Sequence, residues 1–215
     1  MGSVESDPAP AAPPRAPHAL RTAVLPPEER AELLDWVLRH EADFVPAKLF
    51  GGKVDMTGRT NLVCERHVFQ PWKVLLRARF EALMPELAAD IGICDFRADH
   101  LELELTSYGD GAFYKRHIDT LTGAQALTRG RGVRILSAVY YIHRQPRGFT
   151  GGALRLFALR PEHDAHFVDL PPDDNVMIAF PSWARHEVRP VQCPSGNFAD
   201  TRFAINCWVR KKLRA

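Results

Sequence analysis

The hydrophobic periodicity of the chain changes near residue 96, and this change limits the folds that the chain can adopt. Before that point apolar residues recur at helical spacing, as they do over residues 31–38. After that point apolar and polar residues alternate, most clearly in the Leu-Glu-Leu-Glu-Leu run over residues 101–105, which is typical of a strand with one buried face. The sequence therefore predicts helices first and an all-β segment after them.

Two amphipathic helices are expected, over residues 27–44 and 71–90. Glu28 and Glu29 lie in the first turn of one helix, where the helix dipole favours acids, and Pro71 suits the start of the other. Besides the strand near 101–105, further strands are expected between turns rich in Gly, Pro and Asp, over residues 133–142, 153–159, 175–180, 187–191 and 202–210. This order predicts a mainly β fold, a jelly roll or small barrel with the helices packed on one outer sheet.

The composition of the first 27 residues differs from that of the rest. They are rich in proline and alanine, a composition that forms no packed core, so a disordered tail is expected over 1–27. The remaining residues, 28–215, are expected to form a single domain, with helical support over about 28–95 and a β core over about 96–212.

Charge and composition argue against several classes of partner. The net charge is only +2, which disfavours nucleic acid as the main partner. The longest nearly continuous apolar run, over residues 135–142, is too short to span a bilayer, so no membrane partner is expected. The 4 cysteines include no CxxC pair, which argues against a zinc knuckle or a disulfide framework. A reducing cytoplasm is the expected location.

Three residues could bind one metal ion. His117 and Asp119 are two residues apart, so on an extended strand both side chains point to the same face. Alone, this pair is equally compatible with an ion pair on the surface. His186 follows one expected strand and begins the next, so it could complete the two-histidine, one-carboxylate triad that leaves adjacent positions open on a non-haem Fe(II).

The open positions would accept a bidentate 2-oxo acid and dioxygen. The far carboxylate of the oxo acid then needs a fixed cation, and Arg202 begins a strand that could lie beside the metal ligands. The alternative is an arginine at the rim of the site, paired with Asp200. Tyrosine hydroxyls could complete this end of the pocket, and the chain has 4 tyrosines, at 108, 114, 140 and 141. Tyr140 and Tyr141 point to opposite faces, so at most one of them is expected in the pocket.

These motifs resemble the prolyl 4-hydroxylase branch of the Fe(II)- and 2-oxoglutarate-dependent dioxygenases, especially hypoxia-sensor-type prolyl hydroxylases and their bacterial relatives. The resemblance covers about residues 100–210 and rests on Tyr108-Gly-Asp-Gly-Ala-Phe-Tyr-Lys-Arg-His117-Ile-Asp119, Tyr140-Tyr141, Gly151-Gly152-Ala153-Leu154-Arg155, Phe180-Pro181, His186-Glu187-Val188 and Arg202-Phe-Ala-Ile-Asn-Cys-Trp208. Arg202 matches the arginine of the hypoxia-sensor type, where collagen-type enzymes use lysine.

The resemblance implies a double-stranded β-helix with the catalytic iron bound by His117, Asp119 and His186. It also implies 2-oxoglutarate held by Arg202 with Tyr108 and Tyr141, O2 as the oxidant and ascorbate as a reductant. Further positions match residues that line the pocket of such enzymes: Leu154, Val188 and Trp208, with Asn206 where the family has threonine.

Two departures bear on these assignments. The segment between Tyr108 and His117 is one residue shorter than in the hypoxia-sensor type, which affects the match of Tyr108 more than the metal ligands. Asp119 is retained, whereas halogenating relatives have a small residue there, so hydroxylation is favoured over halogenation.

The expected reaction is hydroxylation of an unactivated C–H bond, with succinate and CO2 as coproducts, on a prolyl residue of a protein or peptide. One alternative is a hydroxylase of a free amino acid or small biosynthetic intermediate, because the same scaffold serves both. Another is a cupin-like sensor that binds metal without turnover.

Two other features have alternative readings. The loop over residues 120–132, with Arg129 and Arg131, is either a basic flap over the site or a solvated loop. His163 and His166 are expected in a solvated hairpin rather than at a metal.

Overall fold

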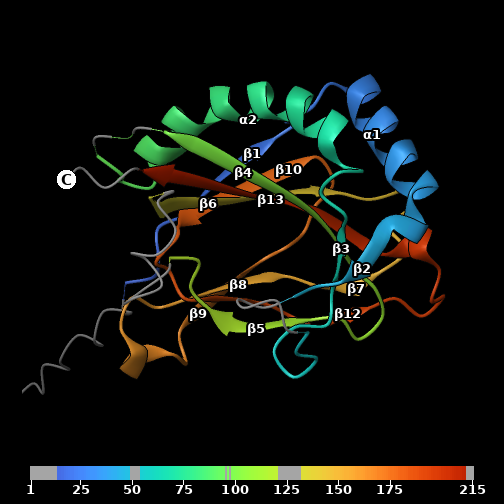
Figure 1. The fold of residues 1–215 in the computed structure, drawn as a ribbon. Helices are drawn as coiled ribbons and strands as arrows, with labels where there is room; N and C mark the ends of the chain where they lie inside the picture. Colours follow the sequence, from blue (N-terminus) through green and yellow to red (C-terminus); the bar gives the residue numbers. More distant parts are fainter. Residues whose placement is uncertain (1–13, 49–53, 95, 97, 121–131, 212–215) are drawn as a thin grey trace, which may run out of the picture.

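The computed structural model describes residues 14–48, 54–94, 96, 98–120 and 132–211. Its elements form three layers, with two helices above a seven-stranded antiparallel sheet and a four-stranded sheet below (Figure 1). The predicted fold class, mainly β with a double-stranded β-helix core, is confirmed. No described helix is both long enough and apolar enough to cross a membrane.

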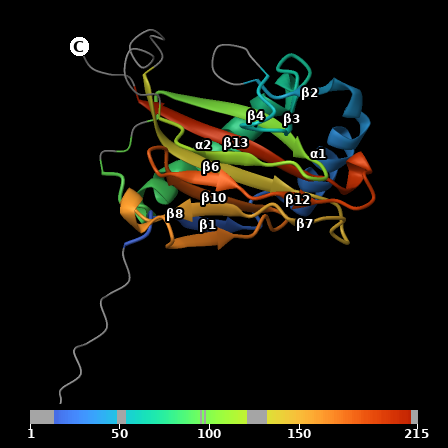
Figure 2. The ribbon, with the colours of Figure 1, turned by 90° about the horizontal axis from the view of Figure 1, so that it is seen from below.

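The large sheet has the strand order β1-β10-β6-β13-β4-β3-β2. Figure 2 shows it from below, with β2 and β3 at one edge and β1 at the other. In that order its strands are β1 (Ala19–Thr22), β10 (Val176–Pro181), β6 (Val133–Ile142), β13 (Arg202–Lys211), β4 (His100–Tyr108), β3 (Leu62–Cys64) and β2 (Phe44–Pro46).

The small sheet has the order β5-β11-β8-β9. It consists of β5 (Tyr114–His117), β11 (His186–Val188), β8 (Leu154–Phe157) and β9 (Phe167–Leu170). A two-stranded sheet pairs β12 (Val191–Gln192) with β7 (Thr150–Gly151). Three short 3-10 helices cover Glu41–Asp43, Pro161–His163 and Phe198–Asp200.

Helices α1 (Pro27–Arg39) and α2 (Gln70–Asp90) cover one face of the large sheet. Their apolar faces pack on the strand residues that point upward, among them Phe203, Ile205 and Cys207 of β13. A second apolar cluster fills the space between the two sheets and includes Ala204 and Tyr141. Since successive strand residues point to opposite faces, β13 contributes odd-numbered residues to the helix layer and even-numbered residues to the space between the sheets.

The predicted tail over 1–27 is wrong for residues 14–27, while residues 1–13 lie outside the described part of the chain. Residues 19–22 form β1, in which Ala19 pairs with Ala179 of β10, and Ala16 and Leu25 are buried. The physical reason is that residues 18–25 contain no proline, so their backbone amides are available to the sheet. The prediction rested on the composition of residues 1–27 as a whole, which did not distinguish the proline-free residues 18–25.

The predicted helical support over 28–95 is incomplete, because β2 and β3 lie between the two helices. The first helix also ends at Arg39 rather than near residue 44, and Phe44 begins β2. The strands predicted after residue 130 are confirmed: the strand over 133–142 has the bounds of β6, and the ends of the others differ from the predicted ones by three residues or fewer.

Candidate active site

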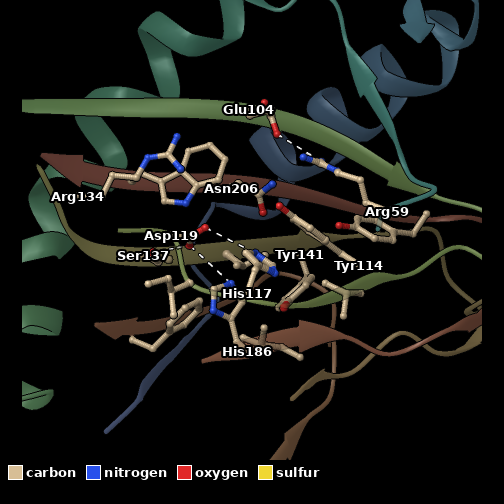
Figure 3. A pocket seen from close by; sticks show the side chains of 18 of the residues that line it. Arg59, Glu104, Tyr114, His117, Asp119, Arg134, Ser137, Tyr141, His186 and Asn206 are labelled. Atoms are coloured by element: carbon tan, nitrogen blue, oxygen red, sulfur yellow. Dashed lines mark hydrogen bonds and ion pairs between the residues drawn. The ribbon is translucent and has the colours of Figure 1, made fainter. Parts of the chain in front are cut away.

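The two histidines of the predicted triad face each other across one strand pair. His117 is the last residue of β5, His186 is the first residue of β11, and the two are direct partners in the antiparallel register. Asp119 follows β5 and lies between them, with Oδ1 3.7 Å from His117 Nε2 and Oδ2 3.6 Å from His186 Nε2. The ligand atoms of all three lie within 4.8 Å of one another, and no other such group occurs in the described residues. The arrangement can hold one metal ion (Figure 3).

Backbone carbonyls orient both imidazole rings. His117 Nδ1 lies 2.8 Å from the Lys115 carbonyl oxygen and His186 Nδ1 lies 2.9 Å from that of Ala184. A carbonyl can only accept, so each Nδ1 carries the proton and each Nε2 presents a lone pair. Contacts of this kind are a common means of fixing metal-binding histidines.

The protonation states of His117 and Asp119 also suit a cation. Burial and the neighbouring His186 imidazole lower the pKa of His117 to about 3, against an opposing effect of Asp119. Burial alone would raise the pKa of the Asp119 carboxyl, but the two imidazoles, Arg134 and the Ser137 hydroxyl lower it overall. At neutral pH the pair therefore offers a neutral imidazole and a carboxylate.

Ser137, on β6, supports the carboxylate. Its hydroxyl donates a hydrogen bond of 2.7 Å to Asp119 Oδ2 and lies 2.9 Å from the Ser182 hydroxyl. Asp119 is also held by its backbone, since its amide donates to the Ser182 carbonyl at 2.9 Å. The carboxylate is thus fixed from two sides.

Arg202 lies in the same cavity and is only 1% exposed. Its guanidinium carbon lies 4.7 Å from the ring centroids of both Tyr108 and Tyr141. Its Nε and Nη1 atoms are buried without a hydrogen-bond partner among the described residues, and so is the Tyr141 hydroxyl. A buried cation with unpaired donors is unfavourable unless an anion completes it. The alternative pairing with Asp200 is not formed, because that carboxylate pairs with Arg144.

Gly152 makes room for Arg202. A Cβ atom at this position would lie 2.7 Å from Arg202 Cδ and 2.8 Å from Val191 Cγ2, and the backbone has a φ of +66°. Both conditions favour glycine. Gly152 of the Gly151-Gly152 motif therefore has a local steric role beside the Arg202 side chain.

The structure brings all of the predicted pocket residues into one cavity of about 600 Å³, a volume within the usual range for small-ligand sites. Burial raises the pKa of Tyr108 to about 12, so its hydroxyl stays protonated and able to donate at neutral pH. The predicted residues that line the cavity are Tyr108, Tyr141, Leu154, Val188, Arg202, Asn206 and Trp208, together with the metal-site group.

The other tyrosines and histidines singled out in the sequence lie in different places. Tyr141 lines the cavity, whereas Tyr140 packs in the helix-facing core against Phe80. Tyr114 lines the cavity and stacks on His117, with ring centroids 3.7 Å apart. His163 and His166 belong to no metal-binding group among the described residues. Arg129 and Arg131, in the loop expected to be either a basic flap or a solvated loop, lie outside the described residues.

Sequence reasoning missed the polar residues that surround the triad. Ser137 has no motif of its own, although its place on the expected strand over 133–142 put it on the same face as Val139 and Tyr141. Arg59 and Glu104 also line the cavity, and Arg59 gave no signal because it lies between the two expected helices and belongs to no expected strand.

Comparisons with known proteins agree with this geometry. The family model described as the 2OG-Fe(II) oxygenase superfamily matches residues 103–210. A Synechocystis protein described as an uncharacterized PKHD-type hydroxylase is 30% identical over 199 residues, which cover 88% of this chain and 61% of that protein. The chain thus spans 61% of the length of this curated relative.

Two solved structures show the same fold. A Pseudomonas putida prolyl-4-hydroxylase superposes with a TM-score of 0.63 at 22% identity, covering 91% of this chain and 94% of its own. A Trichoplax adhaerens prolyl hydroxylase, in complex with a hypoxia inducible factor peptide, gives 0.66 at 19% identity, covering 91% and 84%.

Members of the matched family use Fe(II), 2-oxoglutarate and O2, and the triad offers the ligands that such an iron requires. The family model spans residues 103–210, half of the chain, including both histidines, Asp119 and Arg202. The chain therefore belongs to the 2OG-Fe(II) oxygenase superfamily.

Proposed function

We propose that the chain is an Fe(II)- and 2-oxoglutarate-dependent hydroxylase that acts on a prolyl residue of a protein or peptide. One observation supports this most strongly. A three-ligand metal site shares its cavity with a buried guanidinium whose Nε and Nη1 have no partner among the described residues. A site that only stores metal has no use for such an arginine.

In this proposal His117, Asp119 and His186 hold the iron. Arg202 grips the far carboxylate of 2-oxoglutarate through charge-assisted hydrogen bonds, and the Tyr141 hydroxyl, otherwise unpaired, donates to the same group. The hydroxyl of Tyr108 supports this end of the cavity.

Other residues shape the space around the reacting groups. Leu154 and Val188 provide apolar walls on the small sheet, and Asn206 and Trp208 line the opposite wall from β13. Apolar walls exclude water and strengthen electrostatic contacts within the cavity.

Iron held by His117, Asp119 and His186 would supply the redox chemistry, in which 2-oxoglutarate and O2 give succinate and CO2, with one oxygen atom entering succinate and the other the C–H bond of the substrate. The protein contributes ligand orientation, a fixed carboxylate and the placement of the target. The prolyl target is supported by the relatives, one of which is a prolyl hydroxylase in complex with a peptide.

The test is aerobic turnover of the Fe(II)-loaded protein with 2-oxoglutarate and a panel of proline-containing peptides. Each peptide has a twin with alanine in place of proline, and succinate and oxygenated peptide are quantified by mass spectrometry. We expect oxygenated product from proline peptides and none from their twins or from His186→Ala. Succinate formation that is identical with both peptides of every pair would contradict the prolyl target.

A further inference from the structure

The wall of the cavity carries an excess of positive charge. Two of the side chains that line it are acidic, Glu104 and Asp119, while six are basic: Lys48, Arg59, Arg66, Arg134, Arg202 and Arg210. Arg59 and Arg134 lie on opposite sides of the space above the triad (Figure 3). Iron and 2-oxoglutarate carry opposite charges that cancel, so this excess remains when both are bound.

Three of the six cations already have a role. Arg134 and Arg210 both bind the carboxylate of Glu102, with contacts of 2.7 Å each. Arg202 is assigned to the cosubstrate. This leaves Arg59, Lys48 and Arg66.

Arg59 is rigidly placed on the side of Tyr114 away from the metal site. Its backbone bridges to Tyr114, and its guanidinium carbon lies 4.5 Å from the centroid of the Tyr114 ring. The opposite partner of that ring is His117, stacked at 3.7 Å. Arg59 Nε donates to Asn61 Oδ1 at 2.8 Å. The arginine is thus held at a fixed position relative to a metal ligand.

The charge of Arg59 is only partly compensated. Its nearest acidic group is Glu104, whose Oε1 lies 3.8 Å from Nη2, too far for a hydrogen bond. Arg59 is 8% exposed, so water compensates its charge weakly. Lys48 and Arg66 are exposed at the cavity mouth, and neither forms an ion pair with a described residue.

We propose that Arg59 binds a carboxylate of the substrate, with Lys48 and Arg66 attracting it to the cavity mouth. The inference rests on the proposed function and extends it to the chemical class of the substrate. A guanidinium held by stacking loses little freedom when it forms two parallel hydrogen bonds with a carboxylate. The exposed cations raise the local concentration of anionic ligands.

Such a carboxylate has two sources. It is either an Asp or Glu side chain next to the prolyl residue of a peptide, or the α-carboxylate of a free amino acid. Both present the same chemistry to Arg59, so the experiment separates them.

The test measures binding rather than turnover, with the full chain loaded with Fe(II) and 2-oxoglutarate under anaerobic conditions. The probes are a capped prolyl peptide with Glu on each side of the proline, its twin with Gln, free L-proline and L-prolinamide. Calorimetry gives each Kd for wild type, Arg59→Gln, Lys48→Gln/Arg66→Gln and Arg160→Gln. Arg160 does not line the cavity and is exposed, so it controls for the loss of one charge.

We expect wild type to prefer one carboxylate probe over its uncharged twin by about tenfold or more, as charge-assisted hydrogen bonds give. The preference should vanish in Arg59→Gln, shrink in the double variant and persist in Arg160→Gln. A preference for the Glu peptide assigns the side-chain source, and a preference for L-proline assigns the α-carboxylate. Equal binding within each pair, no binding by any probe, or a preference that survives in Arg59→Gln would overturn the inference.

The melting temperature of Arg59→Gln shows whether this variant is folded. If it is not, the double variant Lys48→Gln/Arg66→Gln still tests the carboxylate preference, because both of its residues are exposed and their replacement should not disturb the fold.

Admission of air to the same samples then separates the anion site from the proposed hydroxylase. A carboxylate preference without oxygenated product contradicts the prolyl hydroxylase but not the anion site. Oxygenation of the Gln peptide at the rate of its Glu twin, together with equal binding of L-proline and L-prolinamide, contradicts the anion site but not the hydroxylase.

Discussion

The two ends of the cavity are built in different ways. The residues assigned to the cosubstrate, Arg202, Tyr141 and Tyr108, lie on long central strands of the large sheet and are at most 3% exposed. The other end, here called the mouth, carries the cations Lys48, Arg59 and Arg66. They lie on short segments outside those strands, and Lys48 and Arg66 are exposed. The register of β13 with β4 and β6 fixes the inner end, whereas loop packing fixes the mouth. The rigid inner end is suited to bind a cosubstrate that all members of a family share, and the loop-built mouth is suited to bind a substrate that differs between members.

Among the variants that distinguish the inner end from the mouth, Arg202→Met should have the largest effect, on the binding of 2-oxoglutarate. Loss of a buried charge that pairs with a carboxylate costs about 2–5 kcal/mol, so the Kd for 2-oxoglutarate should rise by about 30-fold to about 5000-fold. Anaerobic titration of the Fe(II)-loaded protein measures this Kd. Arg59→Gln is the matched control and should leave it unchanged, since Arg59 belongs to the mouth. Equal losses in both variants would show that the two ends are not separate.

Ser137→Ala tests the support of the metal site on the inner side. It removes the hydrogen bond to Asp119 Oδ2, and loss of such a contact typically weakens metal affinity by about 10-fold to about 100-fold. Competition with a chelator gives the Fe(II) affinity. Ser107→Ala is the control, because Ser107 is also buried but bonds to Thr201. The same loss in both variants would assign the effect to the core rather than to Asp119.

Gly152→Ala should weaken 2-oxoglutarate binding by about tenfold, because overpacking against Arg202 Cδ costs about 1–3 kcal/mol. Gly196→Ala separates sterics from backbone conformation. Gly196 has a similar φ of +63°, but nothing lies within 4 Å of its Cβ position. The control should lose stability without any change in the Kd for 2-oxoglutarate. A similar change in that Kd for both variants would contradict the steric role of Gly152.

The pH dependence of stability should reflect the lowered pKa of His117. The pKa of His117 is about 3 in the folded metal-free protein and about 6.5 when unfolded, so the unfolded chain binds the extra proton between these values. Stability therefore falls as pH falls through this window, by about 1 kcal/mol between pH ~6.5 and pH ~5.5. Urea unfolding with chelator present measures the slope. His117→Asn should flatten it, and an unchanged slope would show that His117 is not buried in the neutral form.

The sequence predicted the inner end of the cavity much better than the mouth. The alternation of apolar and polar residues predicted β4, and strands were also expected over 133–142 and 202–210. On these strands Arg202 and Tyr141 point into the space between the two sheets. His117, Asp119 and His186 were recognisable because spacing and strand ends constrain metal ligands. Short patterns within the sequence are therefore enough to predict most of the inner end.

The mouth could not be predicted in this way. Arg59 is one of 28 basic residues, and its position depends on a bridge to Tyr114, a contact between distant parts of the chain. The strand β1 was missed for a related reason, since its four residues gain stability only by pairing with β10. Short segments have weak intrinsic preference, and tertiary pairing decides their conformation.

The central claim is that one cavity holds Fe(II) on the triad and 2-oxoglutarate on Arg202. Its most direct test is anaerobic titration of the apo-protein with Fe(II) and then 2-oxoglutarate, followed by the visible charge-transfer band of the chelated oxo acid. His163→Ala, which removes a histidine outside the triad, serves as the control for His186→Ala. We expect a band in wild type and in His163→Ala, and none in His186→Ala. A band that persists in His186→Ala, or its absence from wild type that has bound Fe(II), would contradict it.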